Sequence, residues 1–327
     1  MPDMHPITQP LRALAARPLG ALATLVFAAL AAVAIAQDKY PSRPIEFIVP
    51  WGPGGGADQL ARKAGKLMEE DLQVSFPVVN SPGATGNTGM AKLLAGQADG
   101  YSISILTWDT YALLATTNTR WGLKDIIPVA LMIKQPSSFL TATNGPLKTW
   151  ADVEREAKTR PLKVAVTGFG SPDEITVNYF VARGLKFVPV PFANPSERYT
   201  AVLGGHADVL YEQMGDVRSF IDSKQIHPVI IFADKRYGPF ADVPASKELG
   251  YDITLPQRRA VIMKAGTDPQ KVKTIANALA KVAASPEYKA YLKEQYATDD
   301  SYFNSEDSLK IMEEELASMK KMVAAPK

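Results

Sequence analysis

A glycine-rich segment at residues 51–58 directly follows a predicted buried strand at 45–49 and leads into a predicted helix at 58–70. Glycines permit a tight turn with bare backbone, and the N-terminus of the next helix presents unpaired N–H groups with partial positive charge. An anion is the ligand that suits such a turn. A glycine-rich connection without a ligand, and a helix-capping role for the acidic residue, stay open as alternatives. The candidate ligand contacts here are Trp51, Gly55, Gly56, Ala57 and Asp58.

A second glycine-rich segment at 80–89 repeats this design between a predicted strand at 76–79 and a predicted helix at 88–95. A third strand is predicted at 101–106. In open α/β sheets ligands bind outside the carboxyl ends of the strands, so both loops and the end of the third strand are expected to face one point. The sequence therefore predicts a carboxylate-sized site. Its further candidate contacts are Ala84, Thr85, Asn87, Thr107 and Trp108.

A dinucleotide site is the sharpest competing interpretation, because Gly52-x-Gly54-x-x-Ala57 satisfies the glycine fingerprint after a first strand. Two features argue against it. The second strand ends at Asn80, where an acidic residue would hold a ribose, and Pro53 is atypical inside the turn. We therefore expect no nicotinamide cofactor, although an oxidoreductase that uses this loop stays an alternative.

Catalytic motifs are absent from the sequence. There is no Gly-x-Ser-x-Gly, no His-Glu-x-x-His and no Walker phosphate loop, the chain has no Cys, and its three His lie apart from one another. An exported hydrolase could still assemble a pair from the many acidic residues, but that signal is nonspecific. The sequence predicts no catalytic residue, no metal site and no cofactor.

Composition indicates a globular protein rather than a fibre or a disordered chain. The 327 residues are 46% hydrophobic and 21% charged, which suits two domains of medium size. The formal net charge is only +2, and basic and acidic residues alternate along the chain. A nucleic-acid-binding surface is therefore not expected.

The first 36 residues have the pattern of a signal peptide. Arg12 and Arg17 precede an apolar run at 19–36 that ends in Ala34-Ile35-Ala36. We expect cleavage after Ala36, which would place the mature protein in the periplasm. The alternative is an uncleaved membrane anchor, because the run is nearly long enough to span a bilayer.

Helices alternate with short apolar strands along two series, one from Arg43 and another from about Thr149, which predicts two α/β domains with mainly parallel sheets. In the second series, Ser171 closes another glycine-containing turn, and Phe192 and Gln213 lie near later strand ends. These three are candidate contacts to the far end of the ligand. Helices predicted at 269–284, 286–297 and 305–321 are expected to pack back on the first domain.

At this point the chain resembles the periplasmic solute-binding proteins of tripartite tricarboxylate transporters, also called the Bug family. The resemblance covers essentially the whole mature chain. It is carried by residues 40–45, 50–58, 80–86, 99–101, 204–209, 242–244 and 248–251.

The resemblance implies a periplasmic-binding-protein type II-like α/β fold, in which two domains form a venus-flytrap cleft. It implies domain 1 at 40–140 plus 262–327 and domain 2 at 141–261. The implied function is non-enzymatic capture of a small carboxylate, a di- or tricarboxylate or an aromatic acid, by a monomer that delivers it to integral membrane subunits. Gly55 to Asp58, Ala84, Thr85 and Asn87 would clamp a carboxylate from the first domain, and Ser171 would hold the ligand from the second.

This chain departs from the family on the far side of the implied pocket. Asp173 and Glu174 stand near the position where the family usually has a His. Phe192-Ala193-Asn194 stands where the family often has Tyr-Lys-Gly. Because of these departures, the sequence does not determine which chemical group the ligand carries at the end away from the bound carboxylate.

Overall fold

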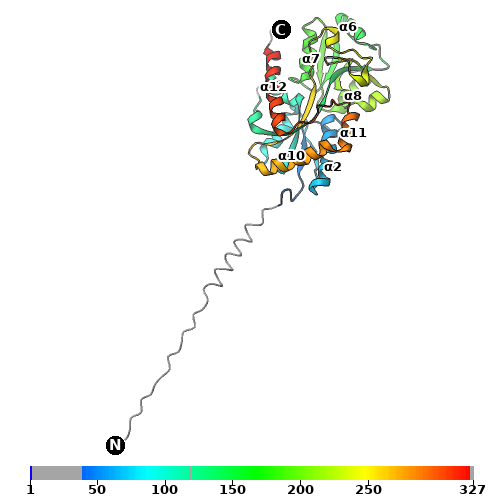
Figure 1. Cartoon of the computed structure of the whole chain (residues 1–327). Helices are drawn as coiled ribbons and strands as arrows, with labels where there is room; N and C mark the ends of the chain where they lie inside the picture. Colours follow the sequence, from blue (N-terminus) through cyan, green and yellow to red (C-terminus); the bar gives the residue numbers. More distant parts are fainter. Residues whose placement is uncertain (2–38, 118, 325–327) are drawn as a thin grey trace. The chain divides into compact units, whose positions relative to one another are not determined.

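The computed structural model describes Met1 and residues 39–117 and 119–324. The chain divides into two units, Met1–Ser42 and Arg43–Lys327, and the second holds every helix and strand described below (Figure 1). The predicted signal peptide lies outside the described residues. Among the helices of the described part, none has the length and apolar character that crossing a membrane requires.

The second unit is built from ten strands and a set of helices that cover them. The strands are β1 (Glu46–Val49), β2 (Val78–Asn80), β3 (Ser102–Thr107), β4 (Ile126–Gln135), β5 (Ser137–Ala142), β6 (Leu162–Val166), β7 (Phe187–Pro191), β8 (Val209–Gln213), β9 (Ile226–Ile231) and β10 (Gln257–Lys264). The α-helices are α2 (Gly56–Leu72), α3 (Asn87–Ala95), α4 (Trp108–Tyr111), α5 (Leu113–Thr116), α6 (Trp150–Thr159), α7 (Pro172–Val181), α8 (Pro195–Leu203), α9 (Arg218–Asp222), α10 (Pro269–Ala284), α11 (Pro286–Glu294) and α12 (Ser305–Ala324). Short 3-10 turns are η1 (Ala84–Gly86), η2 (Leu123–Asp125), η3 (Gly238–Phe240) and η4 (Lys247–Leu249).

The strands form two five-stranded sheets. The first sheet has the order β2-β1-β3-β10-β4, and the second sheet has the order β7-β6-β8-β5-β9. In the first sheet β10 is antiparallel to both neighbours, so the other four strands share one direction. β5 has the same position and orientation in the second sheet. The prediction of mainly parallel α/β sheets is therefore confirmed, with one antiparallel strand in each sheet that the sequence did not reveal.

Each antiparallel strand is the one that arrives directly from the other sheet. The chain leaves the first sheet at the end of β4, passes through Pro136 and enters the second sheet as β5. It returns through residues 232–256 and re-enters the first sheet as β10. This double passage is consistent with two domains, and the domain boundaries given above stay a prediction.

The predicted strands and helices correspond to observed ones within a few residues, and the helix at 269–284 coincides with α10. β4 and β5 have no predicted counterpart, because Pro128 and Pro136 interrupt the apolar run and proline is uncommon inside strands. The β4 ladder accommodates Pro128 at a shift of register opposite Ile262.

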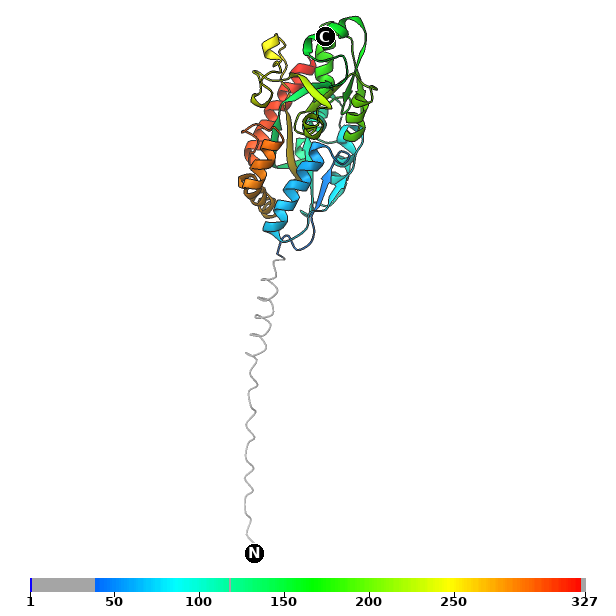
Figure 2. The ribbon, with the colours of Figure 1, turned by 90° about the vertical axis from the view of Figure 1, so that its right-hand side faces the viewer.

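The C-terminal helices pack on the elements of the first sheet, as expected from the sequence. α10 lies beside α2 and contacts β4, and α12 packs on β4 and α5 (Figures 1 and 2). The C-terminal part of the chain therefore covers the first sheet together with α2 and α5.

The core beneath the second sheet is built around Phe139 on β5. Its ring contacts five aromatic rings, with centroids 5.0–6.2 Å apart; three of the pairs are edge-to-face, one is tilted and one is stacked. The five partners are Trp150, Phe180, Phe187, Tyr211 and Phe232. Because Tyr211 lies on β8 and β8 carries site residues, this cluster sets the position of the site.

We predict that Phe139→Ala lowers the free energy of unfolding by about 3–5 kcal/mol, because a large buried ring leaves a cavity that its neighbours fill only partly. Urea denaturation followed by circular dichroism measures this change. Phe169→Ala is the matched control, since the Phe169 side chain is exposed and should change stability by less than about 0.5 kcal/mol. Equal losses in the two variants would contradict the assignment of Phe139 to the core.

Candidate functional site

The loop between β1 and α2 forms as predicted. Gly54 turns the chain with a positive φ of 86°, and Gly55 stands at the N-cap of α2 without any side chain to cap the first turn. Trp51 is buried, and its indole N–H donates to Oγ1 of Thr107 at the end of β3 at 3.0 Å. The loop therefore presents an uncapped helix N-terminus, which attracts negative charge.

Asp58 ties this loop together instead of facing the cavity described below. Its carboxylate accepts hydrogen bonds from the Gly54 N–H at 3.1 Å, from Nε of Arg62 at 2.9 Å and from Nδ2 of Asn80 at 3.0 Å. Burial acts to raise the pKa of Asp58, but these hydrogen bonds outweigh it and lower the pKa below its ordinary value. Asp58 thus joins the first glycine-rich loop to the end of β2.

The second glycine-rich loop contains four consecutive residues with positive φ. Gly83 and Gly86 adopt this region easily, whereas Ala84 and Thr85 do so with φ of 48° and 52°, which costs an L-residue energy. Oγ1 of Thr85 donates to the carbonyl of Phe169 at 3.2 Å. The strained turn therefore contacts the Gly168–Ser171 turn that follows β6.

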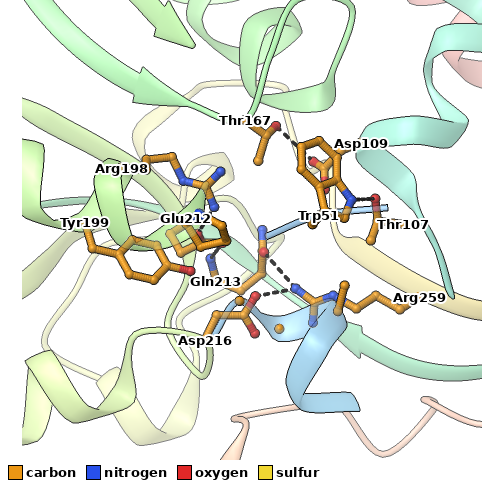
Figure 3. A pocket seen from close by; sticks show the side chains of 14 residues that line it. Trp51, Thr107, Asp109, Thr167, Arg198, Tyr199, Glu212, Gln213, Asp216 and Arg259 are labelled. Carbon is orange, nitrogen blue, oxygen red and sulfur yellow. Dashed lines mark hydrogen bonds and ion pairs between the residues drawn. The ribbon is translucent and has the colours of Figure 1, made fainter. Parts of the chain in front are cut away.

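A small cavity lies where the carboxyl ends of β1 and β3 in the first sheet face those of β6 and β8 in the second (Figure 3). Its volume is about 30 Å³, which is room for one or a few water molecules. It is lined by Trp51, Gly55, Gly56, Ala57, Thr107, Asp109, Thr167, Pro195, Arg198, Tyr199, Glu212, Gln213, Asp216 and Arg259. A solute larger than water therefore requires the walls to move apart.

Six of the predicted contacts line this cavity: Trp51, Gly55, Gly56, Ala57, Thr107 and Gln213. Seven do not: Asp58, Ala84, Thr85, Asn87, Trp108, Ser171 and Phe192. Several of these seven have other partners in the fold. Asn87 accepts from the indole of Trp121, Ser171 caps α7, and Phe192 packs on the core beside β6.

The charged residues of the cavity were not among the predicted contacts. Arg198 on α8 and Arg259 on β10 are both 3% exposed, and Glu212 and Asp216 are buried with them. The sequence holds a signal for Arg259 alone, because Arg258 and Arg259 directly precede four apolar residues, Ala260 to Met263, of the same strand. Arg198 lies on a helix with many polar neighbours, and only its burial distinguishes it.

Arg259 and Asp216 form a buried ion pair between the two sheets. Arg259 also donates to the side chains of Gln135 and Gln213, while its Nε has no hydrogen-bond partner. Burial raises the pKa of Asp216 to about 6, although the neighbouring Arg259 acts to lower it.

The Asp216 carboxylate also lies against the first turn of α2. A Cβ atom on Gly56 would overlap this carboxylate, and a Cβ on Gly55 would lie 2.6 Å from Cγ of Pro195. The anion expected at this helix N-terminus is thus supplied, in this conformation, by the chain's own Asp216. The glycines are required here because the opposite wall approaches the bare backbone.

Arg198 on α8 pairs with Glu212 on β8, and α8 packs against β8 of the second sheet. This bond uses Nη2 of the guanidinium, and Nε and Nη1 have no partner although the side chain is buried. Unpaired buried donors are costly, so two N–H groups of Arg198 are available for an acceptor.

Two further carboxylates are buried near Arg198. Asp109 on α4 lines the cavity, and Asp173 on α7 accepts hydrogen bonds from the backbone and hydroxyl of Thr167. Burial raises the pKa of both carboxyls, with Arg198 opposing this in each. Within the described residues, no cluster of His, Cys, Asp and Glu has the geometry of a metal site.

Residues 60–326 match the sequence family described as the tripartite tricarboxylate transporter family receptor, TctC. The match spans most of the chain, so the chain belongs to this family of solute-binding receptors. The fold and the position of the cavity at the strand ends agree with that assignment.

The chain is also similar to two relatives over most of its length. The chain is 28% identical over 256 residues to Protein BugT of Bordetella pertussis, which covers 75% of this chain and 78% of BugT. It is 27% identical over 297 residues to a UPF0065 protein of Cupriavidus necator, which covers 88% of each chain.

Solved structures agree with the fold. A TctC solute-binding protein from Polaromonas is 28% identical with a TM-score of 0.61, covering 87% of this chain and 99% of that one. MatC from Rhodopseudomonas palustris with bound malate is 20% identical with a TM-score of 0.80, covering 87% and 100%. A second Rhodopseudomonas palustris protein with adipate is 21% identical with a TM-score of 0.80, covering 86% and 97%.

The stability of the protein should fall as pH rises from about 4.5 to 7.5. Asp216 holds a proton in the folded state up to about pH 6, whereas an unfolded Asp releases it near pH 3.9, so the folded state binds more protons in this window. The raised pKa values of Asp109 and Asp173 act in the same direction. The charged groups that act on Asp216 are Arg259 and Glu212.

Urea denaturation at pH 5 and pH 7.5 measures this dependence, with the larger free energy of unfolding expected at pH 5. Asp216→Asn should flatten the difference, and Asp222→Asn on exposed α9 should leave it unchanged. Greater stability at pH 7.5 would contradict the assignment of a raised pKa to Asp216.

Gly56→Ala should favour a more open form of the protein. The added Cβ overlaps the Asp216 carboxylate, and overpacking of about 1–3 kcal/mol corresponds to a shift in population of about 5- to 150-fold. Small-angle X-ray scattering should then report a larger radius of gyration. Gly122→Ala is the control, because a Cβ there meets nothing within 4 Å. An unchanged radius in Gly56→Ala would show that Asp216 simply moves aside.

Proposed function

We propose that this chain is an extracytoplasmic solute-binding protein that captures a small carboxylate-bearing solute in the cavity between its two sheets. The mature monomer, cleaved after Ala36, acts in the periplasm and passes the solute to the integral membrane subunits of a tripartite transporter. Its two domains, 40–140 plus 262–327 and 141–261, close on the solute. No catalytic step and no cofactor form part of this proposal.

One observation carries the proposal: Arg198 is buried at the cavity with two N–H groups that have no partner. Hydrogen bonds between a guanidinium and a carboxylate are charge-assisted, so a solute carboxylate can accept from one of these unpaired nitrogens. The uncapped first turn of α2 lies on the same cavity and offers a second set of donors.

The neighbours support the chemical class of the solute. Related folds are described with bound malate and with adipate, both of which carry carboxylates. One neighbour of similar fold, 20% identical, is described as the periplasmic binding protein BugD, which supports the proposed compartment.

Capture requires the walls of the cavity to separate and then close again. The volume of about 30 Å³ excludes even a small dicarboxylic acid, so the described conformation is contracted. When the walls part, Asp216 leaves the first turn of α2, and a solute carboxylate gains access to those N–H groups. Part of the contact energy then offsets closure, so a micromolar affinity of about −8 kcal/mol needs intrinsic contacts that exceed this figure.

Replacing Arg198 should weaken capture strongly. The probes are malate, adipate, citrate, benzoate and glutamate in a thermal-shift screen, where an acid at 100 times its Kd adds about 2.7 kcal/mol of stability. We expect Arg198→Gln to reduce the affinity for the best acid by about 10- to 100-fold, since charge-assisted hydrogen bonds contribute about 1.5–3 kcal/mol.

Two further variants serve as controls for this test. Arg198→Gln leaves Glu212 buried without its partner, so the double variant Arg198→Gln with Glu212→Gln separates lost binding from lost stability. Arg218→Gln, on the exposed helix α9, should bind like the unsubstituted protein. Undiminished affinity in both Arg198 variants would refute the role of this residue.

A further inference from the structure

The cavity carries more negative than positive formal charge. Three carboxylates line it, from Asp109, Glu212 and Asp216, against the two guanidinium groups of Arg198 and Arg259. All five side chains are at least nine-tenths buried. Charges removed from water need partners, so the pairing among these five groups decides what else the cavity can accept.

Two of the three carboxylates have a guanidinium of their own. Glu212 pairs with Arg198, and Asp216 pairs with Arg259. Asp109 is different: among the described residues no Lys, Arg or His forms an ion pair with it. Its Oδ2 accepts from Nε2 of Gln257 at 2.6 Å. Its Oδ1 accepts from Oγ1 of Thr167 at 3.5 Å, the limit of a hydrogen bond.

Asp109 and Arg198 therefore offer groups of opposite charge to one cavity. Within the described part of the chain, Asp109 offers a carboxylate without an ion-pair partner, and Arg198 offers guanidinium nitrogens without a hydrogen-bond partner. Asp109 is 4% exposed and stands on α4, directly after β3 of the first sheet. Arg198 stands on α8, which packs on β6 of the second sheet, and its Nε and Nη1 have no partner. Figure 3 shows the two side chains on different sides of the cavity, with no interaction drawn between them.

We propose that the solute is a zwitterion, a small amino-carboxylic acid whose ammonium binds Asp109 and whose carboxylate binds Arg198. This inference rests on the proposed function and narrows it to one class among the acids that the sequence leaves open. The ammonium supplies the counter-cation that Asp109 lacks. The carboxylate supplies the acceptor that Arg198 lacks.

Charge balance explains why a plain dicarboxylate fits less well. It would bring two more negative charges into a buried cavity that already has an excess of one, and its distal carboxylate would meet Asp109. A zwitterion adds no net charge to that excess. Discrimination of this kind, in which the wrong solute meets an unpaired charge, is a common source of specificity.

Burial raises the pKa of Asp109, and Arg198 opposes that rise. An ammonium at hydrogen-bond distance would act in the same direction as Arg198 and hold the carboxyl ionised. The cavity is thus arranged so that a cationic group on the solute stabilises the charged form of Asp109, which is the form that binds it.

Calorimetric titration with matched pairs of solutes tests this inference. The pairs are glutamate with glutarate, aspartate with succinate, and 4-aminobutyrate with butyrate, each differing by the amino group alone. We expect at least one amino acid to bind the unsubstituted protein 10-fold or more tightly than its partner. In Asp109→Asn this preference should disappear or reverse, because the amide keeps an acceptor for Gln257 but carries no charge.

The outcomes distinguish this inference from the proposed function. Equal or tighter binding of the acids that lack an amino group to the unsubstituted protein would overturn the zwitterion while leaving carboxylate capture intact. Binding by none of the six solutes, nor by the acids of the thermal-shift screen, would overturn both. Asp71→Asn, on the outer side of α2 where Asp71 pairs with Lys281, is the control and should keep the preference for the amino acid.

Discussion

The structure depends on one constraint, which is that the charges buried between the two sheets need partners of opposite charge. The Arg259–Asp216 pair satisfies this constraint at the point where β10 faces the end of β8. The Asp216 carboxylate lies against the first turn of α2. A low dielectric makes such a pair strong when complete and costly when broken. Gly56 follows from the same constraint, because any side chain there would displace the carboxylate.

The same constraint gives the cavity its chemical character. In the contracted form the chain's own carboxylates occupy both guanidinium groups, so a solute must either exchange with them or use the donors that stay unpaired on Arg198. When the cavity opens, internal pairs of this kind break and their contact energy is lost. The affinity for a simple anion is therefore lower. The proposed zwitterion restores the balance of charge, and in that proposal specificity arises from this difference.

The position of the site follows from topology. Four strands of each sheet share one direction, and the residues after β1, β3, β6 and β8 meet across the cavity. β10 is the exception: it arrives from the second sheet, runs against its neighbours and brings Arg259 into the site from within a strand. The sequence predicts ligand contacts at the ends of parallel strands. Arg259 lies inside an antiparallel strand, so it was not predicted.

The sequence by itself determined the α/β class, the glycine-rich turn before α2, the position of Trp51, Gly56 and Thr107 at strand ends that line the cavity, and the family. These are local features, because strand period, turn glycines and helix starts act over a few residues. Only the tertiary structure decided that Arg198, Glu212, Asp216 and Arg259 share one cavity and that Asp58 braces a loop beside it. Burial and pairing of charges depend on residues far apart in the chain, and no local pattern carries that information.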